Sequence, residues 1–294
     1  YHKQLAADPT FKGRVIPTFR PDRYYELARS DWPSLAKDLG EASNIDTGNY
    51  AGFLQALENR RQYFKENGAV STDHSHFDAG SEPLSDTEAQ RIYAAALRGE
   101  ANKEEADAFR RNMMLETARM ACDDGLVMTL HPAVRRDHDP HNLAKYGLDV
   151  GSDIPVKVEF TEALRPLLGR YGNHPNLNLV VFTLDETVYS RELAPLAGFY
   201  RSLYVGAPWW FIDSPEAIRR FRSAITDTAG FYRTSGFIDD TRAFLSIPTR
   251  HDMSRRLDAG YLAHLVAEER LTVDEAIETA HDLVVTQPRK VFKL

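Results

Sequence analysis

Six short apolar runs, rich in β-branched and aromatic residues, alternate with longer segments of helical periodicity. The runs are RVIPTF (14–19), AVST (69–72), LVMTLH (126–131), LNLVVFTL (177–184), SLYVGAPWWF (202–211) and SGFID (235–239). Most of them are continuously apolar, as expected of strands that are buried on both faces of a parallel sheet. The pattern is typical of βα units and predicts an α/β protein.

The helical segments carry recognisable start and stop signals. Ser214, Pro215 and Gly230 bound the segment 214–230, and Thr272 with Glu275 forms a capping-box pattern at the start of 272–285. Other helices are predicted over 86–99, 104–125 and 251–271. The chain has no fixed repeat, low-complexity tract or linker, so a single domain spanning 1–294 is predicted.

Polar or aromatic side chains follow every one of the six runs. They are Arg20 and Asp22; Asp73 and His74; His131, Arg135 and Arg136; Asp185 and Glu186; Trp209 and Trp210; and Asp240 with Arg242. A TIM-type (β/α)8 barrel builds its active site at the C-terminal ends of its strands, and this pattern predicts such a barrel. A closed barrel has eight strands, so either two were missed or the chain begins after the second strand.

Composition narrows the classes of function. The net charge of −7, with 27% charged residues, provides no global field that would attract nucleic acid or an anionic membrane. One cysteine, Cys122, excludes a disulfide framework and fits a reducing compartment, so a cytoplasmic location is expected. No apolar run approaches the roughly 20 residues of a membrane span, and a soluble protein is predicted.

Asp240 and Arg242 allow two interpretations. A carboxylate at a strand end can bind a metal or act as a general base, and an arginine two residues later can hold an anionic group. Alternatively, the aspartate caps a turn and the arginine forms a surface ion pair. The spacing alone does not separate these interpretations.

The histidines also have competing interpretations. His131 ends an apolar run, where a buried structural histidine is the common alternative to a functional one. His74 and His76 have the i, i+2 spacing that places two side chains on one face of a strand, as a chelating pair requires. Because His76 comes late after its apolar run, a loop position is favoured over a metal site. Asp73 and His74 are kept as candidate site residues.

Three further residues are candidates for ligand binding. Alternation along a strand prevents Trp209 and Trp210 from facing the same side, so one of them is expected to line a pocket, as a sugar ligand would need. Arg20 precedes a proline at a strand end and offers a second guanidinium for an acid, although a surface position is the alternative. Phosphate loops, nucleophile elbows and Cys-x-x-Cys motifs are absent from the sequence.

Taken in order, VIPTFRPD, TDH, LHPAVRRD, GAPWWFIDS and GFIDDTRAFLSIPTRHD resemble the uronate isomerases of the amidohydrolase superfamily. The resemblance runs from about residue 10 to the C-terminus. It implies a metal-dependent barrel in which the six runs are strands three to eight. The first two units would then lie upstream of Tyr1, together with a His-x-His pair that completes the metal site and a catalytic His-Tyr pair.

The resemblance also implies roles for individual residues. Asp240 takes the place of a divalent metal ligand, the metal being usually zinc, and is a candidate proton acceptor. Arg242 and Arg20 take the places of substrate contacts. The family's strand-five histidine falls on His131 and the following arginine on Arg136. Its tryptophan pair falls on Trp209 and Trp210. Its Asp-His pair falls on Asp73 and His74.

The implied reaction is aldose-ketose isomerisation of hexuronates, between D-glucuronate and D-fructuronate or D-galacturonate and D-tagaturonate. One alternative is a one-metal hydrolase of the same superfamily. Another is a part-barrel, inactive alone, that pairs with a separate N-terminal piece or represents an incomplete chain. Six strands would leave two open sheet edges, which favour association with such a piece or a homo-oligomer.

Overall fold

The computed structural model describes residues 1–240 and 243–294. Arg242 therefore lies outside the described residues. The chain divides into two compact units, one formed by 1–74, 80–128 and 163–177 and the other by 75–79, 129–162 and 178–294. Each unit has its own buried core.

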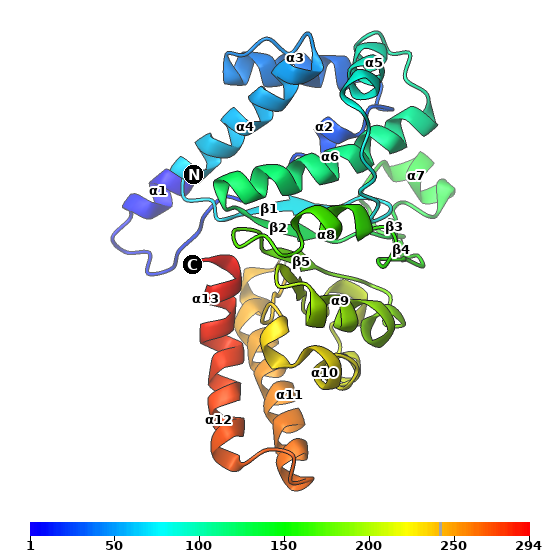
Figure 1. The fold of residues 1–294 in the computed structure, drawn as a ribbon. Coiled ribbons are helices and arrows are strands. Elements are labelled where there is room, and N and C mark those ends of the chain that lie inside the picture. The colour runs from blue at the N-terminus through cyan, green and yellow to red at the C-terminus, as the bar shows by residue number, and fades with distance from the viewer. Residues whose placement is uncertain (241–242) are drawn as a thin grey trace. The chain divides into compact units, whose positions relative to one another are not determined.

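The first unit is mainly helical. Its helices are α1 (His2–Ala7), α2 (Asp22–Tyr25), α3 (Trp32–Ser43), α4 (Tyr50–Glu66), α5 (Asp86–Leu97), α6 (Lys103–Asp124) and α8 (Arg165–Tyr171). Helix α3 packs against α4, and α5 contacts α3, α4 and α6 (Figure 1). The rings of Trp32, Phe53, Tyr93 and Phe109 meet in the core of these helices and are fully buried.

The limits of α6 follow from local sequence. Asn102 caps its first turn and exchanges hydrogen bonds with Glu105 in a capping box. Gly125 ends the helix in the left-handed conformation at φ 77°, which glycine adopts without steric cost. The helix therefore delivers the chain directly into strand β2.

The second unit carries the remaining helices and the short helical turns. Its helices include α7 (Pro140–Tyr146), α9 (Ala194–Phe199), α10 (Pro215–Ala229), α11 (Ile247–Ala267), α12 (Val273–His281) and α13 (Gln287–Phe292). Its shorter turns are η1 (Tyr189–Leu193), η2 (Trp210–Ile212), η3 (Phe231–Arg233), η4 (Phe244–Ser246) and η5 (Asp282–Thr286). Helices α11 and α12 lie side by side, and the predicted capping box of Thr272 and Glu275 is confirmed at the start of α12 (Figure 1).

The main sheet has four strands in the order β1-β2-β5-β6, formed by β1 (Ser71–His74), β2 (Val127–Leu130), β5 (Leu179–Val181) and β6 (Leu203–Val205). Strands β5 and β6 are parallel, with Val180 opposite Tyr204. A separate antiparallel hairpin joins β3 (Val134–Arg135) to β4 (Ile154–Pro155). The α/β class predicted from the apolar runs is confirmed.

Two of the six predicted strands are reduced to single parallel bridges. Of the run 14–19, only Phe19 pairs, with Thr72 of β1. Beyond β6 the bridge is formed by Thr234, and residues 235–239 are not a strand. The reason lies at Gly236, whose φ of 82° takes the chain out of extended geometry, and where a Cβ would lie 2.4 Å from Pro288 of α13.

Candidate active site

Residues 20–25 place two side chains over the end of β1. Helix α2 begins at Asp22, three residues after the bridging Phe19. Arg20 donates from Nε to Asp22 Oδ2 at 2.9 Å, and one of its terminal nitrogens lies 3.5 Å from Asp73 Oδ2. Its side chain remains half exposed. Arg20 and Asp73, both predicted as site residues, are thus brought together, and the guanidinium contacts two carboxylates.

His74 ends β1 and is fully buried. Its Nε2 lies 3.0 Å from Thr72 Oγ1, and its Nδ1 lies 3.8 Å from Asp22 Oδ1. The ring stacks on Tyr25, with 6.2 Å between centroids and 8° between planes. Burial raises the pKa of the Tyr25 phenol, whose hydroxyl hydrogen-bonds Thr117 Oγ1 at 2.8 Å. These contacts fix the orientation of the imidazole.

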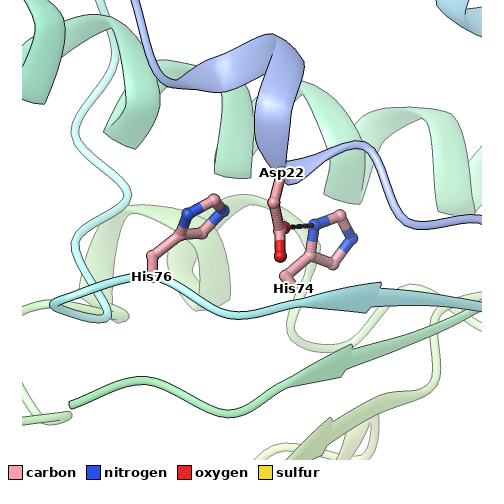
Figure 2. Close-up of side chains that lie close together, drawn as sticks. All are labelled: Asp22, His74 and His76. Atoms are coloured by element: carbon pink, nitrogen blue, oxygen red, sulfur yellow. Dashed lines mark ion pairs between the residues drawn. The ribbon is translucent and has the colours of Figure 1, made fainter. Parts of the chain in front are cut away.

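Asp22, His74 and His76 form a group of buried metal-ligating side chains (Figure 2). One ligand atom from each lies within 4.8 Å of the other two. Figure 2 shows the carboxylate of Asp22 descending from α2 between the two rings, with an ion pair to His74. The backbone of His76 is held where its carbonyl accepts from the Ala133 amide at 3.0 Å.

Two imidazole nitrogens and one carboxylate oxygen are a donor set typical of zinc. Zinc bonds of about 2.0–2.2 Å place tetrahedral ligand atoms about 3.4 Å apart. The 3.8 Å between Asp22 and His74 is close to that separation, and all three ligand atoms lie within 4.8 Å of one another. The residues present fit a divalent metal.

Asp22 was not predicted to be a metal ligand, and a chelating role for His76 was disfavoured. The sequence shows Asp22 only as a strand-end carboxylate after Arg20 and Pro21. Its place beside His74 follows from the pairing of Phe19 with β1, which brings α2 over that strand. The i, i+2 spacing of the histidines was the available signal for the pair.

Four further predicted residues meet in the second unit. The His131 ring packs edge-on against Trp209 at 5.1 Å, and Trp209 contacts Trp210 at 5.6 Å. The Arg136 guanidinium lies 5.6 Å from the Trp210 ring centre. Trp209 is buried and Trp210 half-buried, as expected if only one faces a ligand. Phe211 stacks on Trp210 and extends the aromatic surface.

Gly206 allows the close packing that supports the Trp209 ring. It follows β6 directly, and a Cβ at this position would lie 2.2 Å from the Phe182 ring. Only glycine allows Phe182 to approach so closely. Phe182 in turn packs edge-on against Trp209 at 6.4 Å. The glycine before the Ala-Pro-Trp-Trp segment therefore has a packing role in support of the aromatic cluster.

The acidic pair Asp239–Asp240 divides between two environments. Asp239 is buried and binds Arg250 of α11. Asp240 is exposed and has a left-handed backbone at φ 49°. Asp239 is thus held in a structural contact with α11. The metal role of Asp240 and the substrate role of Arg242 stay predictions.

The parallel strands, with candidate ligands beyond their C-terminal ends, define an α/β protein of the TIM-barrel class. The family model of glucuronate isomerase matches residues 1–292, and the chain belongs to this family. The resemblance seen in the sequence is thereby confirmed. Among the described residues, no helix is long and apolar enough to cross a membrane.

Relatives and solved structures agree with this assignment. A uronate isomerase of Cutibacterium acnes is 56% identical over all of this chain, which spans 62% of that protein. The crystal structure of a glucuronate isomerase from Caulobacter crescentus is 46% identical and superposes with a TM-score of 0.95, over 99% of this chain and 61% of that one. A uronate isomerase from Thermotoga maritima has 27% identity and a TM-score of 0.93, over 99% and 64% of the respective chains. The barrel-type fold expected from the strand ends is that of these structures.

Proposed function

We propose that the protein is a uronate isomerase that interconverts D-glucuronate with D-fructuronate and D-galacturonate with D-tagaturonate. The observation that carries the proposal is the 56% identity to a uronate isomerase along the whole chain. The site residues support it, because the chain offers groups suited to a sugar, to a carboxylate and to a divalent cation. The single buried cysteine, Cys122, fits a cytoplasmic enzyme.

The substrate carboxylate is assigned to arginine. Arg20 is half exposed and is oriented by Asp22 and Asp73, so its guanidinium is held in one conformation near the strand end where an anionic group could bind. Arg242 is proposed as a second partner from the family resemblance. Two guanidinium groups supply the local positive charge that the acidic chain lacks overall.

The apolar face of the sugar is assigned to Trp210. This ring is half-buried, rests on Trp209 and carries the Arg136 guanidinium over it. His131 packs edge-on against Trp209. The cluster holds a flat aromatic surface in one orientation, which is what a pyranose or open-chain sugar needs for stacking.

A divalent metal, zinc in our proposal, is assigned to Asp22, His74 and His76. Asp240 is proposed as a metal ligand from the family resemblance alone. When bound, the metal would polarise the oxygens of the sugar. The carboxylate of Asp240 takes the proton from the carbon next to the aldehyde and returns it to the former aldehyde carbon, while the proton of the adjacent hydroxyl passes to the aldehyde oxygen, so that an enediol lies between aldose and ketose. The imidazole of His74 keeps its orientation through Thr72 and Tyr25.

Turnover assays test this proposal. Purified protein supplied with Zn²⁺ is incubated separately with D-glucuronate, with D-galacturonate and with simple esters and amides, and products are identified by NMR. Ketose formed from a uronate, without ester or amide cleavage, is the expected result. Hydrolysis without any ketose would instead assign the chain to the hydrolases of its superfamily.

A further inference from the structure

Arg250 joins two loops that follow neighbouring strands. It lies in the first turn of α11, and its guanidinium donates to the carboxylates of both Asp213 and Asp239. Asp213 comes directly after the turn η2 that follows β6. Asp239 comes five residues after the bridging Thr234. One planar, five-donor group therefore fastens two segments that the sequence separates.

Both segments contain a non-glycine residue in the left-handed region. Trp210 has φ 49° and lies three residues before Asp213, and Asp240 has φ 49° and lies one residue after Asp239. Conformations of this kind persist only where the surrounding contacts hold them. The two strained residues are also the proposed sugar platform and the proposed proton acceptor.

The neighbouring contacts strengthen this attachment. His251, the next residue of α11, packs its ring edge-on against Phe237 at 4.9 Å. The first turn of α11 therefore contacts the segment that precedes Asp240 through two side chains. The Asp239 side chain is 6% exposed and that of Arg250 is 29% exposed. Burial disfavours the charged guanidinium, yet its hydrogen bonds with Asp213 and Asp239 raise the pKa of Arg250. The ion pairs are thus largely shielded from solvent.

We propose that Arg250 is a positioning residue that holds the loops carrying Trp210 and Asp240 in one fixed arrangement. The inference rests on the proposed function only for the roles of those two residues. Arg250 itself is bound to two carboxylates and acts through them. Lysine cannot replace it fully, because an ammonium on a flexible stem does not present the fork that spans both acids.

Tryptophan fluorescence tests the positioning without any turnover. The chain has three tryptophans, and Trp32 is fully buried in the core of the first unit. In Arg250→Met, acrylamide quenching of the emission is expected to rise, because the Trp210 loop loses its anchor. Arg256→Met is the matched control, since Arg256 lies on the same helix in an exposed pair with Asp252. Wild-type quenching in Arg250→Met, with the fold retained by circular dichroism, would overturn the proposal.

Kinetics on the uronate test the consequence for chemistry. A displacement of a reacting group by about 1 Å costs on the order of 100-fold in rate, so kcat of Arg250→Met is expected to fall by about that factor with a smaller change in KM. Arg250→Lys is expected between this variant and the wild type, and Arg256→Met at the wild-type value. A wild-type kcat in Arg250→Met would contradict the proposal.

A second variant covers the case in which Arg250→Met does not fold, and the fluorescence result is independent of turnover. If Arg250→Met does not fold, Asp213→Asn removes only the partner next to Trp210, and increased quenching is again expected, with unchanged quenching contradicting the proposal. If the wild-type protein forms no ketose, the proposed function fails, whereas the fluorescence result still decides whether Arg250 holds the loop.

Discussion

Thr72 and His74 occupy the same face of β1 and are linked by a buried hydrogen bond of 3.0 Å. This bond occupies Nε2 of the imidazole and leaves Nδ1 directed toward Asp22. In metal centres, a hydrogen bond of this kind sets the tautomer and the orientation of the ligand. At the scale of single residues, Thr72 is therefore expected to control the quality of the metal site.

Thr72→Val is predicted to weaken Zn²⁺ binding by about 10- to 100-fold, because the isosteric side chain lacks the hydroxyl that orients His74. Competition with a chromophoric chelator measures the affinity. Thr72→Ser, which keeps the hydroxyl, is predicted to bind as the wild type does. Equal affinities in wild type and Thr72→Val would show that Thr72 does not orient a ligand.

His251 predicts a dependence of stability on pH. Burial lowers the pKa of His251 below its ordinary value of 6.5. The unfolded chain therefore binds more protons below about pH 6.5, and the contribution of the neutral ring, present above that pH, is lost as the pH falls. His251→Asn is predicted to lose less stability than the wild type between pH 7 and pH 5, measured by urea unfolding. His264→Asn changes an exposed histidine on the same helix and should behave as the wild type.

At the scale of elements, α10, α11 and the sheet edge are joined by one buried ion pair. Arg222 of α10 donates to both oxygens of Asp258 of α11 at 2.6 and 2.8 Å, and both side chains are less than 10% exposed. Another nitrogen of the Arg222 guanidinium lies 3.4 Å from the hydroxyl oxygen of Thr234, the residue that bridges to β6. This contact connects two helices with the strand end that precedes Asp240.

Asp258→Asn is predicted to destabilise the protein by about 3–5 kcal/mol, because it leaves a buried guanidinium without its counter-charge. Asp252→Asn, in the exposed pair with Arg256, is predicted to destabilise the protein far less, because solvent screens that pair. Denaturant unfolding gives both values. Similar losses for the two variants would mean that the Arg222 pair is not specially shielded.

Sequence patterns predicted the elements well wherever the local signal was sufficient. Three apolar runs contain the strands β2, β5 and β6, and the run 69–72 overlaps only the first half of β1. The capping box at Thr272 lies where it was expected. The prediction of a strand over 235–239 was wrong because Gly236 turns the chain, and its apolar residues Phe237 and Ile238 are partly buried without strand pairing. Apolarity reports burial and does not by itself distinguish a paired strand from a buried loop.

At the scale of the whole molecule, the class of fold and the family followed from the order of motifs along the chain. The grouping of Asp22 with His74 did not, because it depends on a single bridge between Phe19 and Thr72 that no local pattern indicates. Likewise, the link from Arg250 to Asp213 and Asp239 arises only when three separate segments fold together. Sequence patterns do not predict which residues from distant segments come together in a site, because that grouping depends on tertiary contacts.

The central claim is that the site recognises a sugar acid and isomerises it, and the most direct measurement compares D-glucuronate with D-glucose. A site built to pair a carboxylate with arginine rejects an analogue that lacks this group, and such discrimination reaches about 10⁴-fold where buried polar groups are left unpaired. Ketose formation from D-glucuronate, with kcat/KM for D-glucose lower by several orders of magnitude, is the predicted result. Equal kcat/KM values for the two sugars, or no ketose from D-glucuronate by metal-loaded protein, would contradict the account.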